Sequence, residues 1–133
     1  SALLTAADAQ GVTLAVHAED QMQSLIEWIQ TVNQPALGLS LDPASLIAAD
    51  DDPVTLVQQQ GPKLTVGRLC DYRQDANVRC AVGEGSLDVM SYRLMLDMAK
   101  GRQGPVVLDL RGLEYPQLAA VEGAKAWDDA IAL

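Results

Sequence analysis

The sequence of 133 residues is long enough for one folded domain with its own core. Hydrophobic residues make up 49% of the chain and charged residues 20%, a balance that excludes the composition of a disordered protein. The formal net charge of -9 argues against nucleic acid or an anionic membrane surface as a partner, because both are bound through clustered lysine and arginine. We therefore expect one domain over residues 1–133, with no nucleic-acid partner and no membrane partner.

The sequence carries no pattern of a membrane anchor or a secretion signal. No apolar run approaches the roughly 20 residues that span a bilayer, and no basic segment precedes an apolar one as in a signal peptide. Cys70 and Cys80 are too few for a disulfide framework and too widely spaced for a metal-binding knuckle. We expect free thiols and a cytoplasmic protein.

The first part of the chain alternates short apolar runs with amphipathic stretches. Residues 2–10 are expected to be the end of a helix, and residues 11–16 a buried strand. Asp20 is expected to cap the next helix, and a second strand is expected over residues 36–41. A short helix should then run from Pro43 to Ala48. The second helix has one apolar face with helical spacing, formed by Met22, Leu25, Ile26 and Ile29.

The second part of the chain continues this alternation. The expected elements are, in chain order, a helix capped by Asp52 and ended by Gly61, a strand over residues 63–69, a polar loop over residues 71–85, a helix capped by Asp88 and ended by Gly101, a strand over residues 105–110 and an alanine-rich helix from Tyr115. The apolar stripe of the last helix is expected to consist of Ala120, Ala124, Trp127 and Ile131. Strands that alternate with helices predict an α/β fold with a parallel sheet and right-handed crossovers.

Ionisable side chains stand at the carboxyl end of every expected strand. In parallel α/β folds this is the end at which functional residues gather. Four strands that each deliver such a group to one edge predict a shared polar site there. The residues are His17 and Glu19 after the first strand, Asp42 after the second, Arg68, Asp71 and Arg73 at and after the third, and Asp109 and Arg111 at and after the fourth.

The ordered set of strand motifs resembles the xylose isomerase-like TIM barrels, which include sugar-phosphate isomerases/epimerases and apurinic endonuclease-like enzymes. Residues 11–17 (GVTLAVH) look like the family's fifth strand, and residues 39–43 (LSLDP) look like its sixth. Residues 65–71 (TVGRLCD) are similar to the seventh, and Leu108-Asp109 falls where the eighth ends. Residues 82–88 (VGEGSLD) resemble the family's GEGxxD loop. The resemblance implies a TIM (β/α)8-type barrel, of which this chain supplies four βα units corresponding to strands 5–8, a half-barrel.

The family's metal-ligand positions are mostly occupied by other residue types. By the resemblance, His17 stands for a glutamate, Ser45 and Arg68 each stand for a histidine, Asp109 stands for a glutamate, and only Asp42 is unchanged. A guanidinium has no lone pair to donate to a metal and stays charged in proteins. We interpret Arg68 as a replacement for the metal that pairs with Asp42 and Asp109. No cofactor is expected, although His17, Asp42 and Asp109 could still bind a divalent metal.

The resemblance therefore implies a sugar isomerase/epimerase-like protein with a degenerate metal site and weak or no metal-dependent activity. The catalytic positions would be His17, Asp42, Arg68 and Asp109, and the ligand-binding positions Glu19, Asp71, Arg73 and Arg111. A metal-free reaction would use His17 as base and Arg68 or Arg111 as electrophile. The alternative is a non-catalytic binding or assembly protein that uses the same pocket for an anionic or polyhydroxylated small molecule.

The length of the chain is about half of what the implied fold requires. A TIM barrel typically needs about 250 residues, and the chain has 133. An isolated half would expose the inner face of its sheet and two unpaired strand edges. We expect the half to be completed by self-association, as a homodimer, or by another barrel half.

Overall fold

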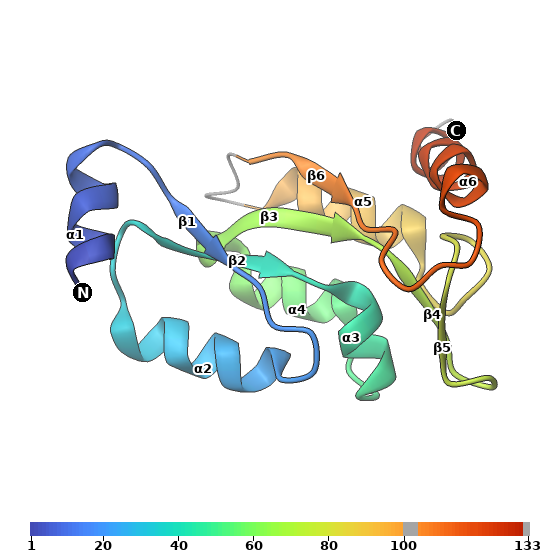
Figure 1. Cartoon of the computed structure of the whole chain (residues 1–133), viewed down its shortest axis with the longest axis horizontal. Coiled ribbons are helices and arrows are strands. Elements are labelled where there is room, and N and C mark those ends of the chain that lie inside the picture. Colours follow the sequence, from blue (N-terminus) through green and yellow to red (C-terminus); the bar gives the residue numbers. More distant parts are fainter. Residues whose placement is uncertain (100–103, 132–133) are drawn as a thin grey trace.

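The computed structural model describes residues 1–99 and 104–131, and Figure 1 shows the arrangement of its elements. Its main sheet has four strands in the order β1-β2-β3-β6, and every neighbouring pair is parallel. The expected parallel α/β fold is therefore confirmed. The strands are β1 (Leu14–Val16), β2 (Leu37–Leu41), β3 (Leu64–Leu69) and β6 (Val106–Leu108).

Helices follow the strands in the expected order. They are α1 (Ala2–Ala9), α2 (Met22–Val32), α3 (Pro43–Ala48), α4 (Pro53–Gln60) with the short 3-10 helix η1 (Gly61–Lys63), α5 (Val89–Met98) and α6 (Pro116–Asp129). Asp52 and Asp88 cap α4 and α5 as predicted, each accepting a backbone N–H of the first turn. The predicted cap at Asp20 is wrong: α2 begins after Gln21, whose side chain makes no capping bond. The predicted helix end at Gly101 lies outside the described residues.

The hydrophobic core lies between the sheet and the helices packed on one of its faces. All five residues of β2 are buried, because helices cover one side of this strand and neighbouring strands flank it. Leu39 and Leu64 are register partners and are both buried in this core. Gly67 of β3 lets α5 approach closely, since a Cβ there would lie 2.9 Å from the side chain of Leu96. Helix packing therefore fixes the sheet from one side.

Residues 71–85 do not form the simple polar loop that the sequence predicts. They contain an antiparallel hairpin of β4 (Asp71–Arg73) and β5 (Val78–Cys80), which extends beyond the carboxyl end of β3 (Figure 1). Asn77 takes a left-handed conformation, with a φ of 50°, just before β5 begins. The prediction failed because each hairpin strand has only three residues, too few for an alternation of apolar and polar residues to stand out in the sequence.

The buried face of α6 differs from the predicted stripe. Ala119 and Gly123 are the buried residues of this helix, whereas Ala124 and Ile131 are exposed. Gly123 lies against β6, where an added Cβ would come within 2.8 Å of Leu108. Trp127 of the predicted stripe is half-buried and packs against the core, so the stripe is right at this residue and wrong at Ala124 and Ile131.

The main sheet is strongly curved, with a curl of 185°. Strands β1 and β6 end the sheet and have a described neighbour on one side only. Within residues 1–99 and 104–131, no helix is both long enough and apolar enough to cross a membrane. Cys70 and Cys80 are free and buried, in agreement with the expected thiols.

Candidate functional site

The carboxyl ends of the four parallel strands bring charged side chains into one cluster. His17 directly follows β1, Asp42 follows β2, Arg68 belongs to β3 and Asp109 follows β6. Asp42 and Asp109 are both buried, although they are carboxylates. Buried carboxylates need partners that replace water, so the contacts of these two residues define the site.

Asp42 is a fully buried carboxylate that also caps helix α3. Its Oδ1 accepts the backbone N–H of Ser45 at 3.0 Å and the thiol of Cys70 at 3.2 Å. Its Oδ2 lies 2.9 Å from Nε2 of His17. Burial opposes ionisation of Asp42, but the hydrogen bonds from His17 and Ser45 outweigh it, so its pKa is below the usual value. Burial and the nearby Asp42 charge raise the pKa of the Cys70 thiol well above its usual value.

Three arginines contact Asp109, and Arg111 and Arg68 make the shortest contacts. Arg111 forms a bidentate ion pair with Asp109, with its Nε 2.8 Å from Oδ1 and one terminal nitrogen 2.6 Å from Oδ2. Arg68 donates to Oδ2 at 3.0 Å, and its Nε donates to Ser40 at 3.0 Å. Burial opposes ionisation here too, but the hydrogen bonds from Arg111 hold the pKa of Asp109 far below its usual range.

Arg79 connects the two carboxylates, a role that the sequence interpretation gave to Arg68. One terminal nitrogen of Arg79 lies 3.4 Å from Asp42 Oδ2, and the other lies 3.5 Å from Asp109 Oδ2. Its side chain is only 15% exposed. The charges of its neighbours outweigh burial and raise its pKa. Arg79 was missed because it lies in β5, inside the segment predicted as a polar loop. Its position between Val78 and Cys80 was the one available signal of a strand.

Glu19 and Arg111 form the solvent-exposed rim of the cluster. The Arg111 side chain is 48% exposed and the Glu19 side chain 53%, with 3.7 Å between their charged atoms. Arg79 also lies 3.9 Å from Glu19. Six of the eight predicted residues are thus brought together, and Arg79 completes the group; the six are His17, Glu19, Asp42, Arg68, Asp109 and Arg111.

Asp71 and Arg73 lie on the hairpin and have other contacts. Asp71 is fully buried, and its two carboxylate oxygens accept four backbone N–H groups, from Tyr72, Gly83, Gly85 and Leu87. Asp71 therefore organises the loop after the hairpin instead of pointing a free carboxylate at a ligand. Arg73 contacts Glu84, with 3.9 Å between the charged groups.

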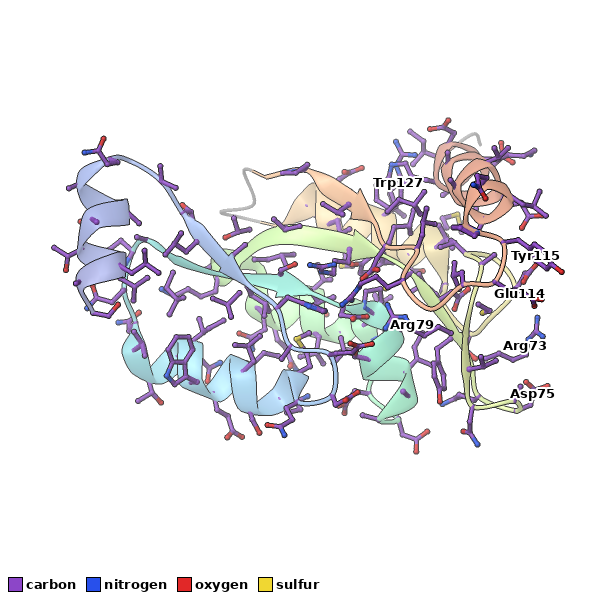
Figure 2. All side chains as sticks on the ribbon, in the orientation of Figure 1. Arg73, Asp75, Arg79, Glu114, Tyr115 and Trp127 are labelled. Atoms are coloured by element: carbon purple, nitrogen blue, oxygen red, sulfur yellow. The ribbon has the colours of Figure 1, made fainter. Side chains whose placement is uncertain are left out.

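A cavity of about 430 Å³ lies beside Arg79, between the hairpin and the start of α6. Figure 2 labels four of its lining residues, Arg73, Arg79, Glu114 and Tyr115. The lining combines cationic, anionic, aromatic and aliphatic side chains. Arg79 contributes to both this cavity and the ion-pair cluster, and the cavity is large enough to hold a small polar molecule.

Three of the clustered residues have the geometry of a possible metal site. The nearest ligand atoms of His17, Asp42 and Asp109 all lie within 4.8 Å of one another. One imidazole and two carboxylates form a donor set that suits several divalent cations. Ser45 has a buried hydroxyl with no hydrogen-bond partner among the described residues.

The fold closely matches proteins of known structure. A xylose isomerase domain protein from Planctomyces limnophilus superposes with a TM-score of 0.69, 20% identity and 98% of this chain covered. The chain has the fold of one half of a xylose isomerase-like TIM barrel. A xylose isomerase-like TIM barrel protein from Mycobacterium smegmatis, solved with magnesium, matches the half-barrel over 98% of its length with a TM-score of 0.71 and 16% identity. The protein IOLI, solved with a bound zinc atom, matches over 97% with a TM-score of 0.68 and 23% identity.

The half-barrel spans about half the length of these solved proteins. It covers 48% of the Planctomyces limnophilus chain, 48% of the Mycobacterium smegmatis chain and 51% of IOLI. The predicted resemblance to the carboxyl-terminal half of this fold is thus confirmed. No protein-family model and no curated protein matches the sequence.

Proposed function

We propose that this half-barrel belongs to a sugar isomerase/epimerase-like protein whose metal site is degenerate and whose metal-dependent activity is weak or lost. One observation carries the proposal: guanidinium nitrogens lie against the carboxylate oxygens that a metal would need. Asp42 Oδ2 is 3.4 Å from Arg79 and 3.8 Å from Arg111. Asp109 Oδ2 is 3.5 Å from Arg79 and 2.6 Å from Arg111.

The residues around Asp42 and Asp109 do not fit a bound divalent cation. Arginine stays protonated in proteins and offers no lone pair. Two unit charges about 4 Å apart interact by about 4 kcal/mol at an effective dielectric of 20. A dication would meet roughly twice that repulsion from each guanidinium that stayed in place. The arginines already neutralise Asp42 and Asp109, so the site gains little from a further cation.

The same contacts limit the acid–base chemistry of the two carboxylates. The lowered pKa values of Asp42 and Asp109 keep both residues ionised near neutral pH. Neither is suited to donate a proton, because a general acid works best with a pKa near the working pH. Metal-free proton transfer, with His17 as base and Arg68 or Arg111 as electrophile, stays a prediction.

Calorimetric titration of Mn²⁺ into purified protein tests the proposal. We expect no binding to the wild-type chain, and measurable binding once Arg68→Gln, Arg79→Gln and Arg111→Gln are combined, because all three arginines that contact Asp42 or Asp109 are then removed. Arg73→Gln is the matched control, since Arg73 lies on the same hairpin but pairs with Glu84. Stoichiometric Mn²⁺ binding to the wild-type chain, with metal-dependent epimerisation of a ketose or aldose, would refute the proposal.

A second candidate function is non-catalytic binding of an anionic or polyhydroxylated small molecule. It is supported by the half-exposed Arg111 and Glu19 at the rim, and by the cavity that Arg79 shares with the cluster. Hydroxyl groups can bond to guanidinium and carboxylate groups together. A screen of sugars and sugar acids by thermal shift, without metal, should find a ligand whose effect is lost in Arg111→Gln. No stabilising ligand in that screen would count against this candidate.

A further inference from the structure

Of the three carboxylates in the ion-pair cluster, Glu19 is the least firmly bound. Asp42 and Asp109 are buried, and both accept several hydrogen bonds. The Glu19 side chain is 53% exposed and accepts no hydrogen bond from the described residues. Its oxygens lie 3.9 Å from Arg79 and 3.7 Å from Arg111, which is too far for a hydrogen bond. The attraction of Glu19 to the two arginines is therefore weak, because water screens exposed ion pairs.

The two oxygens of Glu19 face two different guanidinium groups. Oε1 is the atom nearest to Nη1 of Arg79, and Oε2 is the atom nearest to Nη1 of Arg111. The Nε and Nη2 atoms of Arg111 bind Asp109, whereas its Nη1 has no acceptor within hydrogen-bond distance among the described residues. A guanidinium normally approaches a carboxylate oxygen to about 2.7–2.9 Å. The two Nη1 atoms thus define a position for a carboxylate that Glu19 approaches but does not reach.

The charge balance of the cluster favours a single negative charge at this position. The cluster contains three arginines and three carboxylates, which are Arg68, Arg79, Arg111, Glu19, Asp42 and Asp109. A ligand carboxylate that replaces Glu19 preserves this balance. A neutral ligand in the same place would leave a guanidinium charge without a partner. A phosphate group would bring up to about two negative charges next to two buried carboxylates. A carboxylate therefore fits the position best.

The cavity of about 430 Å³ lies next to this position, because Arg79 lines it, as does the residue that directly follows Arg111. The polar side chains of Glu114 and Tyr115 in its lining suit the hydroxyl groups of a ligand. We propose that Arg79 and Arg111 bind the carboxylate of a small hydroxylated acid, which takes the place of the Glu19 side chain. The proposal rests on the second candidate function and names hydroxylated carboxylic acids as its ligand class.

Calorimetric titration with D-gluconate and D-glucitol tests the proposal. The two compounds are polyhydroxylated chains of equal length that differ at one end, where gluconate has a carboxylate and glucitol a hydroxymethyl group. We expect gluconate, and not glucitol, to bind the wild-type chain. Glu19→Gln should bind gluconate about threefold to fivefold more tightly, because it removes the competing carboxylate. Asp20→Asn is the matched control and should change the affinity by less than about twofold, since Asp20 is exposed, follows Glu19 directly and forms no ion pair with the described residues.

The pattern of affinities separates the failure of this proposal from the failure of the second candidate function. Equal affinity of the wild-type chain for gluconate and glucitol would overturn the carboxylate site and still support the binding of polyhydroxylated molecules. Gluconate binding that Glu19→Gln strengthens no more than Asp20→Asn does would also overturn the proposal, because Glu19 would then not compete with the ligand. Absence of binding of both compounds, to the wild-type chain and to Glu19→Gln alike, would count against the carboxylate site and the second candidate function together.

Discussion

The guanidinium of Arg79 lies between two buried carboxylates and is itself largely shielded from water. Its pairing with Asp42 and Asp109 replaces part of the hydration that both carboxylates lose on folding. Each carboxylate keeps other partners when Arg79 is removed, since Asp42 still contacts His17 and Asp109 still contacts Arg111. The contribution of Arg79 should therefore be smaller than that of the sole partner of a buried charge.

We predict that Arg79→Gln lowers the free energy of unfolding by about 1–3 kcal/mol, because it leaves two buried carboxylates with fewer donors. Urea unfolding followed by circular dichroism measures this change. Arg73→Gln on the same hairpin should shift it by less than about 0.5 kcal/mol, since Arg73 and Glu84 form an exposed pair. Equal effects of the two substitutions would contradict the buried bridging role of Arg79.

The two site carboxylates also predict how stability depends on pH. Their pKa values are lower in the folded chain than the ordinary value of 3.8, so the unfolded chain binds protons first as the pH falls. The stabilisation is fully present above about pH 5 and is lost progressively as the pH drops below 3.8 toward the folded pKa values. Urea unfolding between neutral and acidic pH should show this loss. Asp109→Asn should flatten it, and an unchanged slope in that variant would contradict the assignment.

At the scale of elements, the hairpin β4–β5 positions Arg79, and Asp71 holds the base of that hairpin. The four backbone N–H groups that Asp71 accepts come from the hairpin and the following turn. Gly85 is required there because an added Cβ would lie 2.5 Å from the carbonyl oxygen of Tyr72 and would also clash with the Asp71 carboxylate. The GEGxxD motif noted in the sequence thus has a structural task in this chain.

We predict that Gly85→Ala destabilises the chain by about 2–3 kcal/mol, because the added methyl overpacks the Asp71 contacts. Hydrogen exchange should show faster exchange of the Gly83 and Leu87 amides in this variant. Gly11→Ala is the control: Gly11 has a φ of 66° but no atom within 4 Å of an added Cβ, so only conformational strain of about 1–2 kcal/mol is expected. Unchanged amide exchange in Gly85→Ala would show that the Asp71 contacts tolerate the methyl group.

The sequence predicts elements with a clear hydrophobic period well and polar elements poorly. β2 and α2 follow from apolar runs and helical spacing, and Asp42, Asp52 and Asp88 follow from N-cap chemistry. The hairpin strands have three residues each, so the alternation of Val78, Arg79 and Cys80 was too short to assign Arg79 to the site from sequence. Strand ends correctly located most of the cluster, but which arginine meets which carboxylate depends on side-chain paths that no sequence pattern encodes.

At the scale of the whole molecule, the chain is a half-barrel whose helices pack against one side of a curved parallel sheet. The charged cluster lies at the carboxyl ends of the four strands. The cluster holds its own cations beside Asp42 and Asp109, whereas the matched IOLI and Mycobacterium smegmatis proteins were solved with metal ions. The central claim is that arginine replaces the metal here.

Electron paramagnetic resonance of Mn²⁺ tests this claim most directly. Free Mn²⁺ gives a six-line signal that is broadened when the ion is bound by a protein. We predict that adding the wild-type chain leaves this signal unchanged. The guanidinium groups of Arg79 and Arg111 already contact the carboxylate oxygens of Asp42 and Asp109 that Mn²⁺ would need as ligands. Loss of one equivalent of signal per chain, reversed by Asp42→Asn, would contradict the account.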